Sequence, residues 1–319
     1  MNRPFRWFVS SLLLCPGQGL AQPPGSGGAT MPEGVRVEKD IPYAGTKNPR
    51  QMLDVILPRS SKGDKPLPVV VNIHGGAFKM GDKSMGALDL ADLVAGGDYA
   101  GVTINYRLSG EAVWPAQIHD CKAAIRWVRA NAAKYHFDPD RIAVIGSSAG
   151  GHLAAMLGTS GGVAELEGDL GPYKETSSKV RCVVDQFGPS DLLAMGQYPG
   201  LIKHDAPDSP ESELIGGALQ THKAAARSAS PITYVSPDDP PFLILHGSQD
   251  PLVPFNQSER LAKALKDAGV ACAFVKVVGA GHGRFRSPEV PRRFQQFFAK
   301  YLRDAPVDAI SEKPIPNGP

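Results

Sequence analysis

The chain has 319 residues, of which 42% are hydrophobic and 21% are charged, and its formal net charge is +2. A chain of this length can bury a sizeable core without disulfides or metals, and the composition is that of an ordinary globular protein. The charge is nearly balanced, and no dense stripe of Lys and Arg occurs. We therefore expect no nucleic-acid partner and no long-range attraction to an anionic membrane.

The first residues have the layout of a secretory signal peptide. Two arginines precede an apolar stretch at 7–15, and Gly19 and Ala21 place small residues three and one positions before a cut ahead of Gln22. This arrangement predicts a signal peptide over 1–21 and a secreted or periplasmic protein. The apolar stretch is too short to span a bilayer, so we expect no stable membrane insertion.

Three cysteines remain after such a cut, namely Cys121, Cys182 and Cys272. Because the number is odd, at least one thiol is free or paired with another chain. None has a CxxC spacing, and each lies among apolar residues that suit a small buried side chain. Cys15 offers a lipoprotein anchor as an alternative, although Leu14 before it is larger than the residue that usually precedes such a cysteine.

Both ends of the remaining chain are rich in Pro or Gly. Residues 22–34 are predicted to be a flexible linker, and residues 304–319 are predicted to be a disordered tail. The folded domain is therefore expected at 35–303.

Apolar runs within this domain predict seven strands. Several of the runs are continuous in Val, Ile and Leu rather than alternating, which is typical of a parallel sheet covered on both faces. In chain order, the predicted strands are residues 51–58, 67–75, 100–108, 141–146, 180–188, 241–247 and 271–279.

Helical patterns separate the strands. Apolar residues recur at steps of three and four over 114–135, Asn256 and Glu259 form a capping-pair pattern, and Ser287-Pro288 precedes a stripe of aromatic residues. Alternating strands and helices predict an α/β fold with a mostly parallel central sheet and helices on both faces. Residues 191–239 break the rhythm, and we expect them to form a small cap-like insertion.

The stretch GSSAG, residues 146–150, lies between a predicted strand and a predicted helix. The Gly-x-Ser-x-Gly pattern marks a sharp turn that exposes a nucleophilic serine, with glycines two positions before and after it. Centred on Ser148, the frame has Gly146 and Gly150. Centred on Ser147, it would need Ile145 and Ala149. Ser148 is therefore the candidate nucleophile.

A serine hydroxyl needs a base and an acid that orients the base. In this class of fold they follow the serine in the order acid, then histidine. Asp250 follows the predicted strand 241–247, and His282 follows the strand 271–279 between two glycines. All three residues thus come at the carboxyl ends of strands, where open α/β sheets bind their ligands.

Other histidines and aspartates are weaker candidates. Asp185 and Asp191 come one strand too early, and Asp238 and Asp239 precede their strand. Among the histidines, we expect His246 to support the Asp250 loop, His152 to be structural and His74 to fix its own loop. The remaining histidines are His119, His136, His204 and His222.

The glycine-rich loop HGGAF, residues 74–78, follows a predicted strand and offers backbone N–H groups to a developing oxyanion. We expect the N–H of Ala149, after the nucleophile, to be one donor, and those of Gly76 and Ala77 to be the others. No Gly-Lys-Ser/Thr follows the loop, which excludes a phosphate-binding P-loop.

These motifs together resemble the α/β-hydrolase superfamily, in particular hormone-sensitive-lipase-like esterases and the bacterial feruloyl and acetyl-xylan esterases. The resemblance spans residues 35–302 and includes HGGAF, INYRLS, GSSAGG, FGPSDL and HGSQD. It implies an α/β-hydrolase fold, hydrolysis of carboxylic esters with no metal or cofactor, and a triad at Ser148, Asp250 and His282. Many relatives have a third glycine where this chain has Ala77, so the resemblance leaves open which N–H groups form the oxyanion hole.

We therefore expect a secreted serine carboxylesterase acting on short-chain esters, either small molecules or acetyl and feruloyl esters linked to plant polysaccharide. Two other activities stay open, an arylformamidase and a small serine peptidase. A third alternative is a catalytically silent hydrolase fold used for binding. The sequence does not indicate an oligomeric state.

Overall fold

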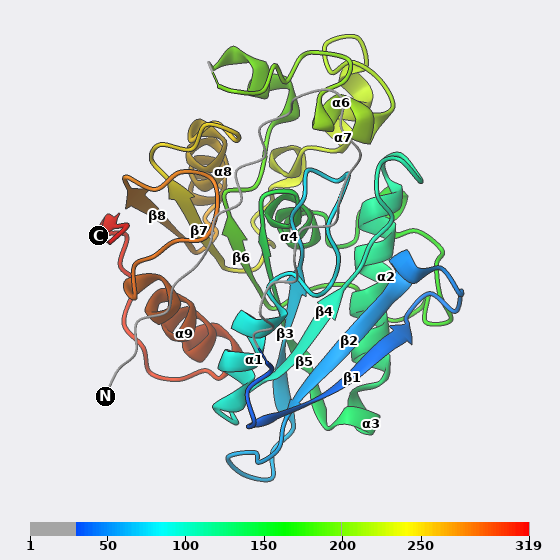
Figure 1. Cartoon of the computed structure of the whole chain (residues 1–319), viewed down its shortest axis with the longest axis vertical. Coiled ribbons are helices and arrows are strands. Elements are labelled where there is room, and N and C mark those ends of the chain that lie inside the picture. Colours follow the sequence, from blue (N-terminus) through cyan, green and yellow to red (C-terminus); the bar gives the residue numbers. More distant parts are fainter. Residues whose placement is uncertain (1–29, 199, 319) are drawn as a thin grey trace, which may run out of the picture. The chain divides into compact units, whose positions relative to one another are not determined.

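The computed structural model describes residues 30–198 and 200–318. The predicted signal peptide and most of the predicted linker lie outside the described residues. The folded unit, from residue 31 onward, is built around a nine-stranded sheet with the order β1-β2-β4-β3-β5-β6-β7-β8-β9 (Figure 1). β2 pairs antiparallel with both β1 and β4, and every other pair is parallel. The strands are β1 (Val35–Pro42), β2 (Met52–Pro58), β3 (Leu67–Ile73), β4 (Ala100–Ile104), β5 (Phe137–Ser147), β6 (Cys182–Gln186), β7 (Phe242–Gly247), β8 (Cys272–Val278) and β9 (Ile315–Pro316).

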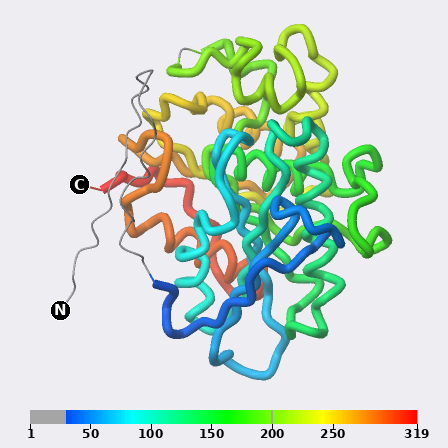
Figure 2. The backbone as a smooth tube through the Cα atoms, turned by 45° about the vertical axis from the view of Figure 1, so that its right-hand side comes forward, coloured from blue at the N-terminus to red at the C-terminus, as the bar shows by residue number. Residues whose placement is uncertain are grey.

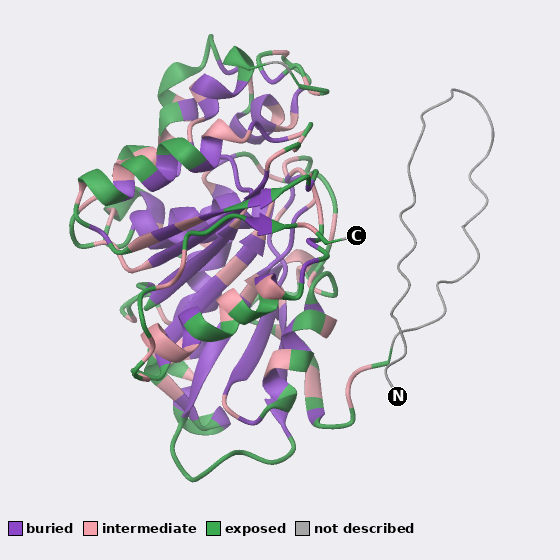
Figure 3. Cartoon of the chain, turned by 90° about the vertical axis from the view of Figure 1, so that its left-hand side faces the viewer, coloured by how far each residue is buried: buried purple, intermediate pink, exposed green. Residues whose placement is uncertain are grey.

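The continuous apolar runs are explained by burial of both faces of the sheet, which Figure 3 shows as almost wholly buried strands. On β3, Val69 and Val71 point into one core, whereas Val70 between them points into the other. The first core lies under α2, α4 and α8, and the second lies under α1 and α9. Each strand residue therefore contributes to one of two packed layers, as the mostly parallel sheet predicts.

Helices follow most of the parallel strands, as expected. The predicted helix at 114–135 is split into two helices at Asn131. The longer helices are α1 (Ala87–Ala95), α2 (Ala116–Ala130), α4 (Ala149–Thr159), α8 (Asn256–Asp267) and α9 (Glu289–Leu302). The shorter ones are α3 (Ala132–Tyr135), α5 (Ala164–Glu167), α6 (Pro210–Ile215), α7 (Lys223–Ser228) and the 3-10 turns η1 (Pro49–Gln51), η2 (Leu192–Gln197) and η3 (Pro231–Tyr234). No described helix is long and apolar enough to cross a membrane.

In the described part of the segment 191–239, which omits residue 199, the helices are all short, namely η2, α6, α7 and η3. In the view of Figure 1, α6 and α7 are drawn above α4. The segment packs on the core through buried apolar side chains such as Leu192, Met195 and Leu214. Its chain also meets the Asp250 loop, because the N–H of Leu201 donates to the carbonyl of Pro251 at 2.8 Å.

The prediction of a disordered tail at 304–319 is wrong for the described part of that segment. Ile315 is buried and β9 pairs in parallel with the end of β8. Figure 2 shows this red end of the chain running beside the orange segment that follows β8. Glu312 accepts hydrogen bonds from Lys266 at 2.6 Å and from the N–H of Phe274 at 2.7 Å. Contacts with residues distant in sequence, which local composition does not reveal, hold the tail.

Two further expectations need correction. Residues 31–34, at the end of the predicted linker, are ordered, since the carbonyls of Glu33 and Gly34 accept hydrogen bonds from Arg59. Asn256 does not cap α8, because it is the first helical residue and its side-chain amide has no partner among the described residues. The cap position belongs to Phe255, so the pattern was displaced by one residue.

Candidate active site

Ser148 lies at the turn between β5 and α4, in a backbone conformation with φ +55° and ψ −122°. Two glycines allow this turn. A Cβ on Gly146 would lie 2.1 Å from the carbonyl oxygen of Gly150, and a Cβ on Gly150 would lie 2.1 Å from that of Ile73. Both distances are far below van der Waals contact, so glycine is required at each position. The frame centred on Ser148 thus has a steric reason.

We expect Gly150→Ala to lower the free energy of unfolding by at least about 3 kcal/mol, because the new methyl group would overlap the backbone of β3. Gly110→Ala is the matched control, since a Cβ at Gly110 meets no atom within 4 Å. Urea denaturation of both variants measures the difference. Equal midpoints for the two variants would contradict the steric argument.

His282 joins Ser148 to Asp250. Its Nε2 lies 2.9 Å from Ser148 Oγ, and its Nδ1 lies 2.7 Å from Asp250 Oδ2. A carboxylate oxygen only accepts, so Nδ1 carries the proton and the lone pair of Nε2 is free to accept the serine hydroxyl proton. The structure therefore brings together the three residues that the sequence singled out, from the ends of β5, β7 and β8.

The Asp250 carboxylate is fully buried, yet it is well supplied with donors. Burial alone would raise its pKa, but hydrogen bonds from His246, His282 and the N–H of Val253 outweigh this effect and hold the pKa of Asp250 well below its ordinary value. The N–H of Leu252 also donates to Oδ1, at 2.8 Å. Asp250 thus stays ionised beside the imidazole of His282.

Two side chains, Phe187 and His246, contact the triad in ways that the sequence did not predict. The ring of Phe187 meets the ring of His282 edge-on at 4.7 Å and that of His246 at 6.3 Å. His246 itself contacts Asp250, with 3.3 Å between Nε2 and Oδ2. The expectation that His246 supports the Asp250 loop is confirmed, since Nε2 also lies 3.1 Å from the carbonyl oxygen of Val253.

The loop after β3 passes beside Ser148, since a Cβ on Gly75 would lie 3.4 Å from the Cβ of Ser148. Gly76, Ala77 and Phe78 all have positive φ, at 115°, 55° and 60°. Ala77 thus adopts the left-handed conformation that the third glycine of relatives would favour. Within the described residues, the N–H groups of Gly76 and Ala77 have no hydrogen-bond partner. Ala149 begins α4, so its N–H has no partner within that helix either.

His74 fixes this loop rather than titrating near it. Its ring stacks on Tyr106 at 4.3 Å, and Tyr106 donates its hydroxyl to the carbonyl of His74 at 3.0 Å. Burial lowers the pKa of His74 to about 4, so it is neutral at physiological pH. His152 is similarly buried, with a pKa of about 4, and bonds to the carbonyl of Ala229 in the insertion. Both have the structural roles expected of them.

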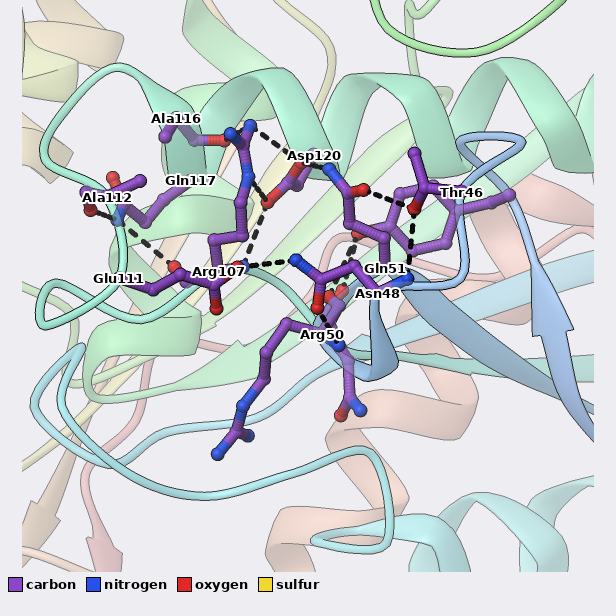
Figure 4. Close-up of polar contacts among 12 residues, drawn as sticks. Thr46, Asn48, Arg50, Gln51, Arg107, Glu111, Ala112, Ala116, Gln117 and Asp120 are labelled. Carbon is purple, nitrogen blue, oxygen red and sulfur yellow. Dashed lines mark hydrogen bonds and ion pairs between the residues drawn. The ribbon is translucent and has the colours of Figure 1, made fainter.

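A network of polar side chains around Arg107 and Asp120 also holds the loop that follows β3 (Figure 4). Arg107 binds Asp120 through Nε at 2.8 Å and Nη2 at 3.0 Å, and Gln51 donates to the same carboxylate at 2.8 Å. From the segment that holds Gln51, Arg50 reaches the carbonyl of Gly81 at 2.6 Å. The network therefore ties the loop that carries Gly76 to η1 and α2.

The three cysteines, together with His119 and His136, are not among the residues that surround Ser148, Asp250 and His282. Cys121, Cys182 and Cys272 are free thiols, and burial raises the pKa of each. His119 and His136 bond to the carbonyl oxygens of Glu165 and Asp64. None of these thiols is suited to act as a thiolate nucleophile.

Asp185 has a buried carboxylate that lies next to the first turn of α4, just after Ser148. Its Oδ1 accepts the N–H of Gly188 at 2.9 Å, and its Oδ2 has no partner among the described residues. A Cβ on Gly151, in the first turn of α4, would lie 2.4 Å from Oδ1. Burial raises the pKa of Asp185 to about 7.

Because the unfolded chain loses this proton near pH 4 and the folded chain near pH 7, the folded state binds the extra proton in between. Stability should therefore fall as pH rises through that window, by up to about 1.4 kcal/mol per pH unit. Asp185→Asn, which mimics the neutral acid, should remove this slope, so that the variant gains on the wild type as pH rises from about 4 to about 7. Urea denaturation across this range measures it, and parallel curves would contradict the assignment.

Comparisons with known proteins identify the family of the chain. The BD-FAE family model matches residues 53–265, and the model of the TAP-like proteins matches residues 219–313. Esterase LipQ of Mycobacterium tuberculosis is 32% identical over 244 residues, which are 76% of this chain and 56% of LipQ. The chain therefore spans little more than half the length of that curated relative.

Two solved structures are similar over more than four-fifths of this chain. A truncated carbohydrate esterase from gut microbiota is 35% identical, with a TM-score of 0.79, and covers 84% of this chain and 96% of its own. The bifunctional GH43-CE protein of Bacteroides eggerthii is 37% identical, with a TM-score of 0.75, over 83% of this chain and 35% of its own. The match of the family model over residues 53–265, together with the sheet order, shows that the chain belongs to the BD-FAE family and has the α/β-hydrolase fold.

Proposed function

We propose that this protein is a serine carboxylesterase that works through an acyl-enzyme on Ser148. The observation that carries the proposal is the position of His282, with Nε2 2.9 Å from Ser148 Oγ and Nδ1 2.7 Å from the buried Asp250 carboxylate. This arrangement can take a proton from the hydroxyl while the buried charge stabilises the imidazolium that forms.

In the proposed reaction, Ser148 Oγ attacks the ester carbonyl carbon as its proton passes to His282 Nε2. The tetrahedral oxyanion is bound by the N–H of Ala149 together with the N–H groups of Gly76 and Ala77. As the intermediate collapses, His282 returns the proton to the leaving alcohol. Water, activated by the same imidazole, then attacks the acyl-enzyme and releases the acid.

We propose short acyl groups, acetyl to butyryl, as the preferred substrates. Lipases that act on lipid surfaces usually present a large apolar face. Here the insertion at 191–239 has only the six-residue helices α6 and α7, so no long amphipathic lid is available. The two carbohydrate-esterase relatives favour esters carried on a polysaccharide, such as acetyl or feruloyl groups.

A chain-length series of p-nitrophenyl esters tests the proposal, with acetylated xylan, emulsified triolein, N-formylkynurenine and a peptide anilide assayed beside it. We expect the highest kcat/KM at two to four carbons and little turnover of triolein. A maximum at eight carbons or more would overturn the chain-length claim. Turnover of N-formylkynurenine or of the anilide above that of every ester would replace the esterase with a formamidase or a peptidase.

A further inference from the structure

We propose that His246, held in one tautomer by the Val253 carbonyl and the Asp250 carboxylate, is a positioning residue that shares the charge of that carboxylate with His282. The inference rests on the proposed function, because it concerns the acid of the proposed triad. It extends the Ser148–His282–Asp250 chain of contacts by two residues, to the core beneath the site.

The contacts of the His246 ring determine where its proton lies. Nε2 lies 3.1 Å from the carbonyl oxygen of Val253 and 3.3 Å from Asp250 Oδ2, and both oxygens only accept. A proton on Nε2 satisfies both, whereas a lone pair there would face two acceptors. Nδ1 is then the acceptor, and the hydroxyl of Ser258 donates to it at 2.7 Å.

The surroundings hold this tautomer in place. His246 and Ser258 are fully buried, on β7 and α8. The rings of Phe187 and Phe255 meet the imidazole of His246 edge-on, at 6.3 Å and 5.3 Å. Because the ring is buried and packed between aromatic edges, water cannot easily replace the contact with Asp250.

The two carboxylate oxygens of Asp250 have different hydrogen-bond partners. Oδ1 accepts the N–H groups of Leu252 and Val253, at 2.8 Å and 2.9 Å, which fix the loop. Oδ2 is shared by two imidazoles, with His282 Nδ1 at 2.7 Å and His246 Nε2 at 3.3 Å. The N–H of His246 stabilises the negative charge on Oδ2, so less of that charge is available to hold a proton on His282.

Loss of the His246 N–H should therefore make His282 easier to protonate, and the acid limb of the pH–rate profile should move to higher pH. Lost packing alone would lower the rate without moving that limb. The other charged and titratable groups around this end of β7 stay unchanged in the variants below, so their effects cancel in the comparison. They are Lys276, opposite His246 on β8, Asp185 on β6 and Glu259 on α8.

A matched pair of amides tests this. The nitrogen of the Gln side chain reaches the place of Nε2, whereas that of Asn reaches only the place of Nδ1. For p-nitrophenyl acetate, we expect His246→Asn to raise the midpoint of kcat/KM against pH by at least about half a unit and to lower kcat roughly tenfold with little change in KM. His246→Gln should restore the wild-type midpoint and most of kcat. Ser258→Ala should shift the midpoint less than His246→Asn, because two acceptors still hold the proton on Nε2.

A wild-type midpoint in His246→Asn, or an equal shift in both amide variants, would overturn the proposal. Nitrogen-15 NMR of the wild-type imidazoles needs no variant to fold. We expect the proton of the neutral His246 ring to be on Nε2, and a proton on Nδ1 would also overturn the proposal. Failure of the proposed function would look different, since Ser148→Ala would then keep the wild-type rate.

Discussion

Replacing Ser148 with Ala is expected to lower kcat for short-chain ester hydrolysis by roughly 10⁴–10⁶-fold, because no other hydroxyl of the described residues bonds to the base. Among the described residues, His282 Nε2 contacts Ser148 Oγ and makes no hydrogen bond with Ser147. Ser147 is the last residue of β5 and pairs with Gln186 on β6.

Ser147→Ala is therefore the matched control, and it should keep most of the activity. Steady-state kinetics with p-nitrophenyl acetate measures both variants, and thermal unfolding shows whether each is folded. An equal loss in the two variants would mean that the wrong serine frame had been chosen. A fully active Ser148→Ala protein would remove the covalent mechanism altogether.

Asp250→Asn should reduce kcat by about 10⁴-fold while leaving the fold in place. An amide at this position can turn its NH₂ group toward His282, which would draw the imidazole into the tautomer with its proton on Nε2. That tautomer cannot accept the proton of the Ser148 hydroxyl, 2.9 Å away. The loss should therefore fall on kcat rather than on KM.

Asp267→Asn, at an exposed position at the end of α8, is the control for the same chemical change away from the site. It should have wild-type kinetics. If Asp250→Asn kept a tenth or more of the wild-type kcat, the carboxylate would not be the group that orients His282.

Much of the fold follows from local patterns. The apolar runs predict β2 to β8, and on strands buried on both faces, such as β4 and β7, apolar residues occur at nearly every position, so burial is visible in the sequence itself. β1 was not predicted, since VRVEKDIP carries charges along an edge of the sheet where only one neighbour pairs with it. β9 was missed for a related reason, because two residues in a Pro-rich segment give no periodic signal.

The residues of the site also differ in how far the sequence could identify them. Ser148, Asp250 and His282 could be singled out because each follows a recognisable strand, and the fold class fixes their order along the chain. The roles of Phe187 and Ser258 depend on contacts across β6, β7 and α8 that no local pattern encodes. His246 was placed in its loop, but its contact with the carboxylate, and hence its tautomer, needed the structure.

The two outer strands of the sheet determine how much of its backbone is open to pairing with a second chain. An unpaired strand offers a row of N–H and C=O groups to any neighbouring chain. On one side, β1 carries charged residues and its register with β2 shifts between Glu38 and Ile41, which makes it a poor template. On the other side, β9 and Glu312 occupy backbone groups of β8 that would otherwise be open. The C-terminal segment thus leaves fewer backbone groups of β8, the strand that leads to His282, open to edge-to-edge pairing with another chain.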